Sequence, residues 1–213
     1  MDTMFSVPAL PDAPPAVRAV EYVRSCETEP VTNHSIRSYL FATLLAEHEG
    51  LRPGTDFDKD LLFFACVLHD LGTSPLASGT QRFEVDGADM AATFLADSGF
   101  GAADVDLVWE AIALHSTPGI PERRGPIAYL TRRGVAIDFG IGSDFISDER
   151  GRAIHDRYPR LNMATALIDE IVRHAARGRM NALPPSVAAE CIRERKDGLT
   201  TLERVTRAGR WGE

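Results

Sequence analysis

The sequence predicts an all-α protein built as one helical domain. Apolar residues recur at three- and four-residue intervals through most of the chain, which is the spacing of a buried helix face. No segment alternates polar and apolar residues in the way that a half-buried strand does. With 213 residues, 44% of them hydrophobic, the chain is long enough for one sizeable core and short for two.

The first half of the chain supplies three expected helices. Valines within 17–23 lie three residues apart, which predicts a first helix. Thr32 is expected to cap a long second helix that ends at Gly50. Asp58 is expected to cap the segment 61–72, LLFFACVLHDLG, which is apolar nearly all round. We therefore expect this segment to be the central buried helix.

The second half continues the helical pattern. Segments 82–99, 103–116 and 161–178 each place apolar residues at helical intervals, and segment 123–143 begins in the same way before its glycines. We expect an extended, proline-rich arm at 1–15, a single domain at 16–183 and a helical tail at 184–213. Both core burial and a homodimer interface would explain the apolar residues at 17–23 and 161–171.

Composition excludes several classes of partner. The net charge of −8 disfavours nucleic acid and anionic membranes, since either needs a basic surface. No apolar run reaches the roughly 20 residues of a membrane span, and the N-terminus does not read as a secretory signal. Cys26, Cys66 and Cys191 are widely separated and form no metal-binding pair. A reducing cytoplasmic compartment and a small-molecule substrate are expected.

Five polar residues interrupt apolar helix faces and are the candidates for chemistry. They are His34, His69, Asp70, His115 and Asp138. Any one of them alone is explained by a hydrogen-bonded core residue, because buried polar groups find partners. Three other histidines, at 48, 155 and 174, have polar neighbours and are expected to be solvated. The second His-Asp pair, at 155–156, is rejected as a metal site for the same reason.

Taken together, the buried candidates favour a metal site. Adjacent residues on a helix point about 100° apart, so His69 and Asp70 converge on one point only where the helix ends. Two imidazoles and two carboxylates form a nitrogen and oxygen ligand set that suits Zn²⁺, with Fe²⁺, Mn²⁺ and Ni²⁺ as alternatives.

The order of these residues resembles a known signature. His34, then His69-Asp70, then Asp138 is similar to the H…HD…D pattern of the HD superfamily, whose domains are all-helical. The segments NHSIRSYLFA, HDLGTSP, RFEVDGADMA and WEAIALHSTPGI resemble its cyanamide hydratase-like branch. The resemblance covers roughly residues 32–140.

The resemblance implies an HD-domain helical bundle with a zinc site in its core. The implied ligands are His34, His69, Asp70 and Asp138, with His115 beside the open coordination position. Cyanamide hydratases add water across a C≡N bond to give urea. The implied activity is hydration of cyanamide, or of a similarly small nitrile to an amide, by metal-bound hydroxide. In this interpretation Asp70 accepts the proton of the water, and His115 orients the substrate or passes a proton to its nitrogen.

The remaining site candidates each have an ordinary alternative. Thr73 either binds substrate or satisfies carbonyls at the helix end. Arg37 either binds substrate or forms a salt bridge. Phe83 and Trp109 either line the pocket or belong to the core, and Glu84 either lines the pocket or forms an ion pair with the neighbouring arginine.

Two departures from related signatures separate the branches of the superfamily. Many HD phosphohydrolases resemble H-D-x-x-K, and here Thr73 replaces that lysine. A neutral hydroxyl cannot neutralise a phosphate, although Arg37 or Arg82 could compensate. Dinuclear HD enzymes have an additional histidine where this chain has Phe83, which predicts one metal and disfavours oxygenase chemistry. A phosphohydrolase acting on a nucleotide or phosphate ester stays the alternative, and a non-catalytic metal-containing ligand-binding module is the second.

Overall fold

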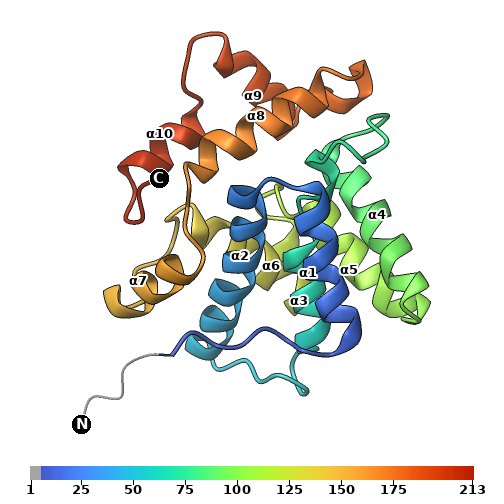
Figure 1. Ribbon diagram of the computed structural model, residues 1–213, viewed down its shortest axis with the longest axis vertical. Helices are drawn as coiled ribbons and strands as arrows, with labels where there is room; N and C mark the ends of the chain where they lie inside the picture. Colours follow the sequence, from blue (N-terminus) through green and yellow to red (C-terminus); the bar gives the residue numbers. More distant parts are fainter. Residues whose placement is uncertain (1–5) are drawn as a thin grey trace.

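The structure is a computed structural model that describes residues 6–213, and within that range it contains ten α-helices and no β-strand (Figure 1). The expected all-α fold is confirmed. The helices are α1 (Pro14–Cys26), α2 (Glu29–His48), α3 (Lys59–Val67), α4 (Phe83–Asp97), α5 (Ala102–Leu114), α6 (Pro126–Asp138), α7 (Asp148–Arg157), α8 (Met163–Ala175), α9 (Val187–Arg195) and α10 (Thr201–Ala208).

The centre of the bundle is the pair α2 and α6, with α3 and α5 packed beside it. The two central helices approach closely because α6 carries a glycine at the crossing. A Cβ on Gly134 would lie 2.3 Å from the carbonyl oxygen of Ser38 and 2.9 Å from the Cβ of Ala42. This contact sets the position of Asp138, the last residue of α6, against α2.

A second apolar cluster covers the N-terminal end of α2. Helix α8 crosses over this end, with α9 and α10 beyond it (Figure 1). The cluster joins Val31 of α2 and Phe83 of α4 to the buried side of α8, which carries Met163, Ala164, Leu167, Ile168, Ile171 and Ala175. Helices α4 and α8 therefore cover the end of α2 that carries His34.

Two helix boundaries differ from the sequence-based expectation in ways that affect the site. Helix α2 begins at Glu29 rather than after Thr32, because Pro30 is accepted in the first turn. His34 consequently lies in the second turn. Helix α3 begins as expected, with the Asp58 side chain accepting from two backbone N–H groups, but it ends at Val67.

The residues that follow α3 form a turn and then a short 3-10 helix, Leu71–Thr73. His69 and Asp70 thus lie in the turn itself, where adjacent side chains are not held about 100° apart. A Cβ on Gly72 would lie 1.8 Å from the carbonyl oxygen of Phe83, so a glycine is needed for α4 to pack against this turn.

Two of the histidines expected to be solvated are not. His174 is 2% exposed and lies 2.8 Å from Asp86, and His155 is partly buried against Phe41 and Trp211. His48 is exposed and stacks on Phe145.

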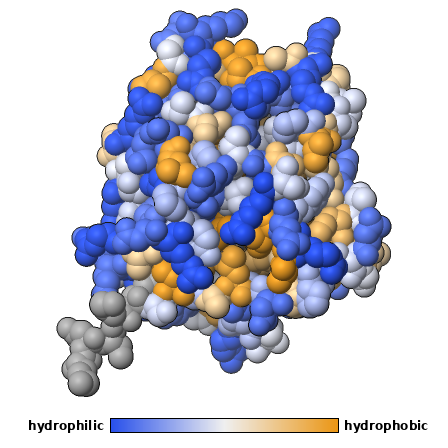
Figure 2. Space-filling view, viewed as in Figure 1, coloured by the Kyte–Doolittle hydropathy of each residue, from blue (hydrophilic) through white to orange (hydrophobic). Residues whose placement is uncertain are grey.

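The tail expected at 184–213 contains α9 and α10. Of the arm expected at 1–15, residues 1–5 lie outside the described part of the chain. The division into arm, domain and tail stays a prediction, as does a homodimer. Among residues 6–213, no helix combines the length and the apolar character that a membrane crossing requires. The surface seen in Figure 2 mixes polar and apolar residues.

Candidate metal centre

Four helix ends bring the predicted site residues together. His34 comes from α2, His69 and Asp70 from the turn after α3, and Asp138 from the end of α6. His115 follows the last residue of α5. All five are at most 4% exposed, so the cluster is enclosed by the fold.

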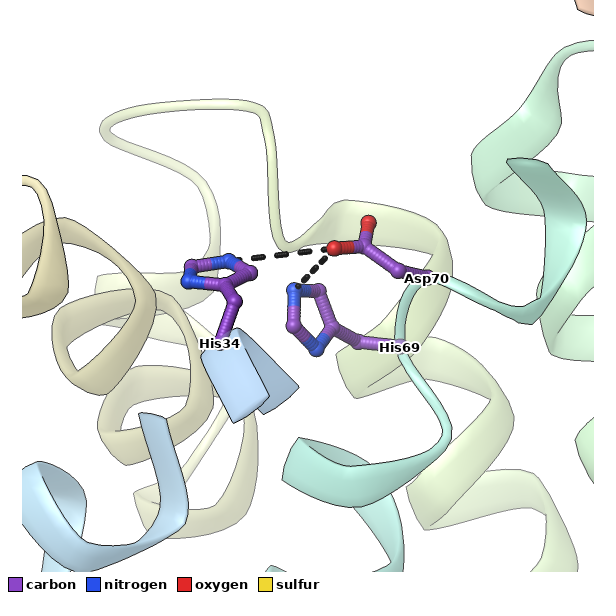
Figure 3. Close-up of side chains that lie close together, drawn as sticks. All are labelled: His34, His69 and Asp70. Carbon is purple, nitrogen blue, oxygen red and sulfur yellow. Dashed lines mark ion pairs between the residues drawn. The ribbon is translucent and has the colours of Figure 1, made fainter. Parts of the chain in front are cut away.

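Three of these side chains present their ligand atoms to one another (Figure 3). Nε2 of His69 lies 3.1 Å from Oδ2 of Asp70, and Nε2 of His34 lies 3.7 Å from the same oxygen. The candidate ligand atoms of the three residues all lie within 4.8 Å of one another. Side chains from two separate elements thus converge on one point.

Hydrogen bonds at the opposite ring nitrogen orient the histidines. Nδ1 of His69 lies 2.7 Å from the carbonyl oxygen of Cys66, and Nδ1 of His115 lies 2.7 Å from that of Ile112. A carbonyl only accepts, so each Nδ1 carries the hydrogen and each Nε2 keeps its lone pair. Nδ1 of His34 faces a carboxylate, which has the same effect.

The inward-facing atoms lack hydrogen-bond partners. Nε2 of His34, Nε2 of His69 and Oδ2 of Asp70 are buried and form no hydrogen bond. Such groups are rare because burying an unsatisfied polar atom costs free energy. Two neutral nitrogens and one carboxylate oxygen are suitable donors for a divalent metal, and the residues present therefore fit one.

The electrostatic environment favours the metal-binding forms of most of these groups. Burial lowers the pKa of His34, against an opposing effect of Asp138, and so favours the neutral imidazole. Burial and the adjacent His69 lower the pKa of His115 to about 4. Burial opposes ionisation of Asp70, but His69 holds the pKa of that carboxyl below its usual value. Burial alone would lower the pKa of His69, but Asp70, the Cys66 carbonyl and Asp138 together raise it above its usual value.

Asp138 does not belong to the group of converging ligand atoms. Its Oδ2 lies 2.6 Å from Nδ1 of His34, on the side of the ring that faces away from Asp70. The guanidinium of Arg37 donates to both of its oxygens, at 2.7 and 2.8 Å. The carboxylate is therefore fully engaged outside the converging group. Its role as a fourth ligand stays a prediction, and the observed contact is that of a carboxylate orienting a histidine.

His115 adjoins the other side of Asp70. Its Nε2 lies 3.9 Å from Oδ1 of Asp70, and its ring lies 4.8 Å from that of His69. Phe83 packs edge-on against His115, with ring centroids 5.8 Å apart. The two candidates Phe83 and His115 thus lie together at the edge of the cluster.

Glu84 is a buried anion close to His115 rather than part of a surface ion pair. Its carboxylate accepts from Arg82 at 2.8 Å and from Ser116, and it acts on the pKa of His115. Arg82 and Ser116 also line an open cavity of about 650 Å³, whose other side is lined by residues of α9 and α10. Glu84 therefore links the edge of the cluster to this cavity.

Two of the predicted substrate-binding residues, Arg37 and Trp109, form contacts with other parts of the protein. Arg37 is fully buried, and its guanidinium donates to Asp138 and to the carbonyl oxygens of Tyr158 and Pro159. Trp109 donates to Asp89, packs against the core and lines a separate cavity. The contacts of Arg37 match its alternative role in a salt bridge, and those of Trp109 match a place beside the core. A substrate-binding role for either residue stays a prediction.

Thr73 lies beside the site, and its hydroxyl already has hydrogen-bond partners within the protein. Its hydroxyl lies 2.9 Å from the carbonyl oxygen of Asp70, which also accepts from the backbone N–H of Thr73, and 3.2 Å from a carboxylate oxygen of Glu170. The hydroxyl thus adds a second hydrogen bond to a carbonyl at the helix end, which is the alternative role expected for Thr73, and a substrate-binding role stays a prediction.

A pair of buried carboxyls near Asp70 was not predicted. Glu170 accepts from Thr28 at 2.6 Å, and Glu27 has one oxygen without a partner. Burial, then the charges of Asp70 and Glu170, raises the pKa of Glu27 well above its usual value. Glu27 follows a helix end and Glu170 sits within an amphipathic helix, so both positions are typical of exposed residues in the sequence.

Comparison with known proteins agrees with this arrangement. Residues 31–175 match the model of the HD domain, and that range contains every candidate metal ligand. The chain is 27% identical over 152 residues to cyanamide hydratase DDI2 of Saccharomyces cerevisiae and equally to cyanamide hydratase DDI3 of that yeast. Each alignment covers 67% of this chain and 64% of the relative. The chain belongs to the HD domain family, whose members bind divalent metals in an all-helical fold.

Proposed function

We propose that this protein hydrates cyanamide, or a comparably small nitrile, at a single divalent metal. The observation that carries the proposal is the set of buried, unpartnered ligand atoms on His34, His69 and Asp70, with His115 directly beside it. The similarity to two yeast cyanamide hydratases supports the reaction class. Enclosure of the cluster favours a substrate of few atoms.

The proposed ligands are Nε2 of His34, Nε2 of His69 and Oδ2 of Asp70. Zn²⁺ is the proposed ion, and Fe²⁺, Mn²⁺ and Ni²⁺ accept the same donors. A metal held by three protein ligands keeps an open position, lowers the pKa of the water it binds and so supplies a nucleophile near neutral pH. Asp138 orients His34 in this arrangement.

Asp70 and His115 divide the proton transfers. Water adds its oxygen to the nitrile carbon, and both of its protons end on the nitrile nitrogen once the resulting imidic acid becomes the amide. Oδ2 of Asp70 faces the ligand nitrogens while Oδ1 faces Nε2 of His115, so one carboxylate contacts both partners. We infer that Asp70 accepts the first proton and that His115 passes it to nitrogen.

The neighbouring residues position these groups. The edge-on contact of Phe83 restricts the ring of His115 and provides an apolar wall, while the Glu84 carboxylate favours the protonated form of His115 during transfer. Thr73 holds the carbonyl of Asp70 and thereby the turn that carries it.

The contacts of the two candidate cations weigh against a phosphohydrolase. Arg37 is neutralised by Asp138, and Arg82 is paired with Glu84, so neither offers an unpaired charge to a phosphate. A cytoplasmic location is proposed because Cys26, Cys66 and Cys191 are all free thiols.

A paired assay tests the proposal. Zinc-loaded protein is incubated with cyanamide and urea is measured, with metal-stripped protein as the control. We expect urea formation that depends on metal. The absence of urea above the stripped control, together with phosphate release from a nucleotide panel, would replace the hydratase with the phosphohydrolase. Stoichiometric metal without turnover on either substrate class would favour the non-catalytic module.

A further inference from the structure

The C-terminal end of α6 is held by groups that are distant in sequence. The last carbonyls of a helix have no partner within the helix and must find one elsewhere. Nε1 of Trp211 donates to the carbonyl oxygen of Ile137 at 2.8 Å. Arg160 donates to the carbonyl oxygen of Asp138 at 2.9 Å. The helix end that carries Asp138 is thus capped by two side chains from outside it.

Arg160 also connects this helix end to the C-terminal turn at 209–213. The same guanidinium nitrogen that reaches the Asp138 carbonyl lies 3.3 Å from Oδ1 of its carboxylate. Nε of Arg160 donates to the carbonyl oxygen of Gly212 at 2.7 Å. Arg160 is 5% exposed, so these contacts are shielded from water and screened little.

The Trp211 side chain packs against α2 and α7. Its ring stacks on Phe41 of α2 with centroids 5.8 Å apart and lies against His155 of α7. A Cβ on Gly151 would lie 2.5 Å from the indole ring, so α7 must carry glycine at this point for the ring to fit. The C-terminal turn is therefore packed against the bundle rather than frayed from it.

The contacts of Arg160 are connected to His34 through Asp138. Arg160 and Arg37 hold the Asp138 carboxylate, and Asp138 accepts from Nδ1 of His34. A change in the position of Asp138 would release the ring of His34 or change which nitrogen carries its hydrogen.

We propose that Arg160 and the C-terminal turn at 209–213 are positioning elements of the metal site, which hold Asp138 so that Nε2 of His34 is free to bind the ion. The inference rests on the proposed metal site. It assigns a role in metal binding to the turn at 209–213, which lies beyond the region 31–175 that matches the HD domain. Partners that orient a metal-binding histidine typically contribute about 10–100-fold to affinity.

Metal affinity of the full-length protein tests the inference. Zn²⁺ and Co²⁺ dissociation constants are measured by competition with a chromophoric chelator for wild type, Arg160→Gln, Trp211→Ala and Trp211→Phe. Arg193→Gln, which changes an exposed arginine of α9, is the matched control. We expect Arg160→Gln and Trp211→Ala to weaken both ions about 10-fold or more, with a smaller effect for Trp211→Phe, which keeps the ring and loses the N–H.

The visible spectrum of bound Co²⁺ separates positioning from general destabilisation, because it reports the ligand geometry at saturating metal. We expect it to change in Arg160→Gln and Trp211→Ala and to stay unchanged in Arg193→Gln. If Arg160→Gln does not fold, Gly151→Ala displaces the indole without altering any residue of the turn and serves in its place.

Affinities within twofold of wild type, with an unchanged Co²⁺ spectrum, would overturn the inference. Failure of the wild type to bind either ion would instead overturn the proposed metal site.

Discussion

Nδ1 of His34 lies 2.6 Å from Oδ2 of Asp138, and neither side chain is exposed to solvent. The carboxylate accepts the ring hydrogen at Nδ1, which leaves a lone pair on Nε2 directed at Asp70. The tautomer of His34 is thus fixed by the fold itself. Because the carboxylate is also bound by Arg37, the charge of Asp138 is balanced without any contribution from the ligand cluster.

Asp138→Asn tests whether Asp138 orients His34 or binds the ion directly. If it orients His34, the substitution leaves three ligands in place, and we expect metal affinity to fall about 10–100-fold. A ligand role would instead cause near-complete loss of metal. Chelator competition measures the difference, and Asp156→Asn, at an exposed position of α7, is the control.

His69→Ala removes a proposed ligand and one of the two nitrogens nearest Asp70. We expect loss of both the metal and urea formation, because two remaining ligands cannot compete with water for the ion. Metal content after dialysis and the cyanamide assay measure the two effects. His48→Ala, at an exposed histidine, should retain both, and full metal occupancy in His69→Ala would show that the ligand assignment is wrong.

The helical fold could be predicted from the sequence because apolar spacing reports which face of each helix is buried. The cap at Asp58 was predictable too, since its side chain accepts from the backbone directly after it. The cap at Thr32 was wrong because Pro30 fits the first turn of a helix, so the helix begins at Glu29 and Thr28 is its N-cap. Boundaries depend on such local chemistry more than on periodicity.

The partners of the site were less predictable. Arg160 and Asp138 are 22 residues apart and belong to no common periodic pattern, and their contact depends on how the connection after α7 folds back. Glu170 lies on a helix whose apolar stripe predicts core contacts, yet it faces Thr28 and Thr73. Tertiary contacts of this kind are not encoded in local spacing.

Gly134→Ala is expected to destabilise the pair α2 and α6. The new Cβ would meet the backbone oxygen of Ser38 at 2.3 Å, and backbone cannot move aside without separating the helices. We expect a loss of about 2 kcal/mol or more in the free energy of unfolding, typical of overpacked cores. Chemical denaturation measures it. Gly101→Ala, whose Cβ would meet only the Asp104 carboxylate at 4.0 Å, should cost less than about 1 kcal/mol, and equal losses would contradict the steric argument.

Glu27→Gln is expected to stabilise the metal-free protein at pH 8. Burial and the charge of Asp70 raise the pKa of Glu27, so folding opposes ionisation of this carboxyl. The unfolded chain loses the proton above its ordinary pKa, and stability therefore falls as pH rises through that value. The amide removes this cost, and a gain in the free energy of unfolding is expected at pH 8 but not at pH 4. Thermal unfolding of both proteins at pH 8 and pH 4 measures this gain. An equal effect of the substitution at the two pH values would show that ionisation of Glu27 is not its cause.

His155→Phe is expected to reduce the acid sensitivity of the protein. Burial lowers the pKa of His155 from 6.5 to about 4, so the folded protein binds its proton less readily than the unfolded chain. Stability from the neutral ring is fully present above pH 6.5 and is lost as pH falls towards 4, by about 2 kcal/mol. Phenylalanine keeps the contacts with Phe41 and Trp211 and cannot titrate. Urea denaturation of the metal-free protein at pH 7.5 and 4.5 measures the difference, with His48→Phe as the exposed control. A pH dependence equal to that of wild type would show that His155 is not the group responsible.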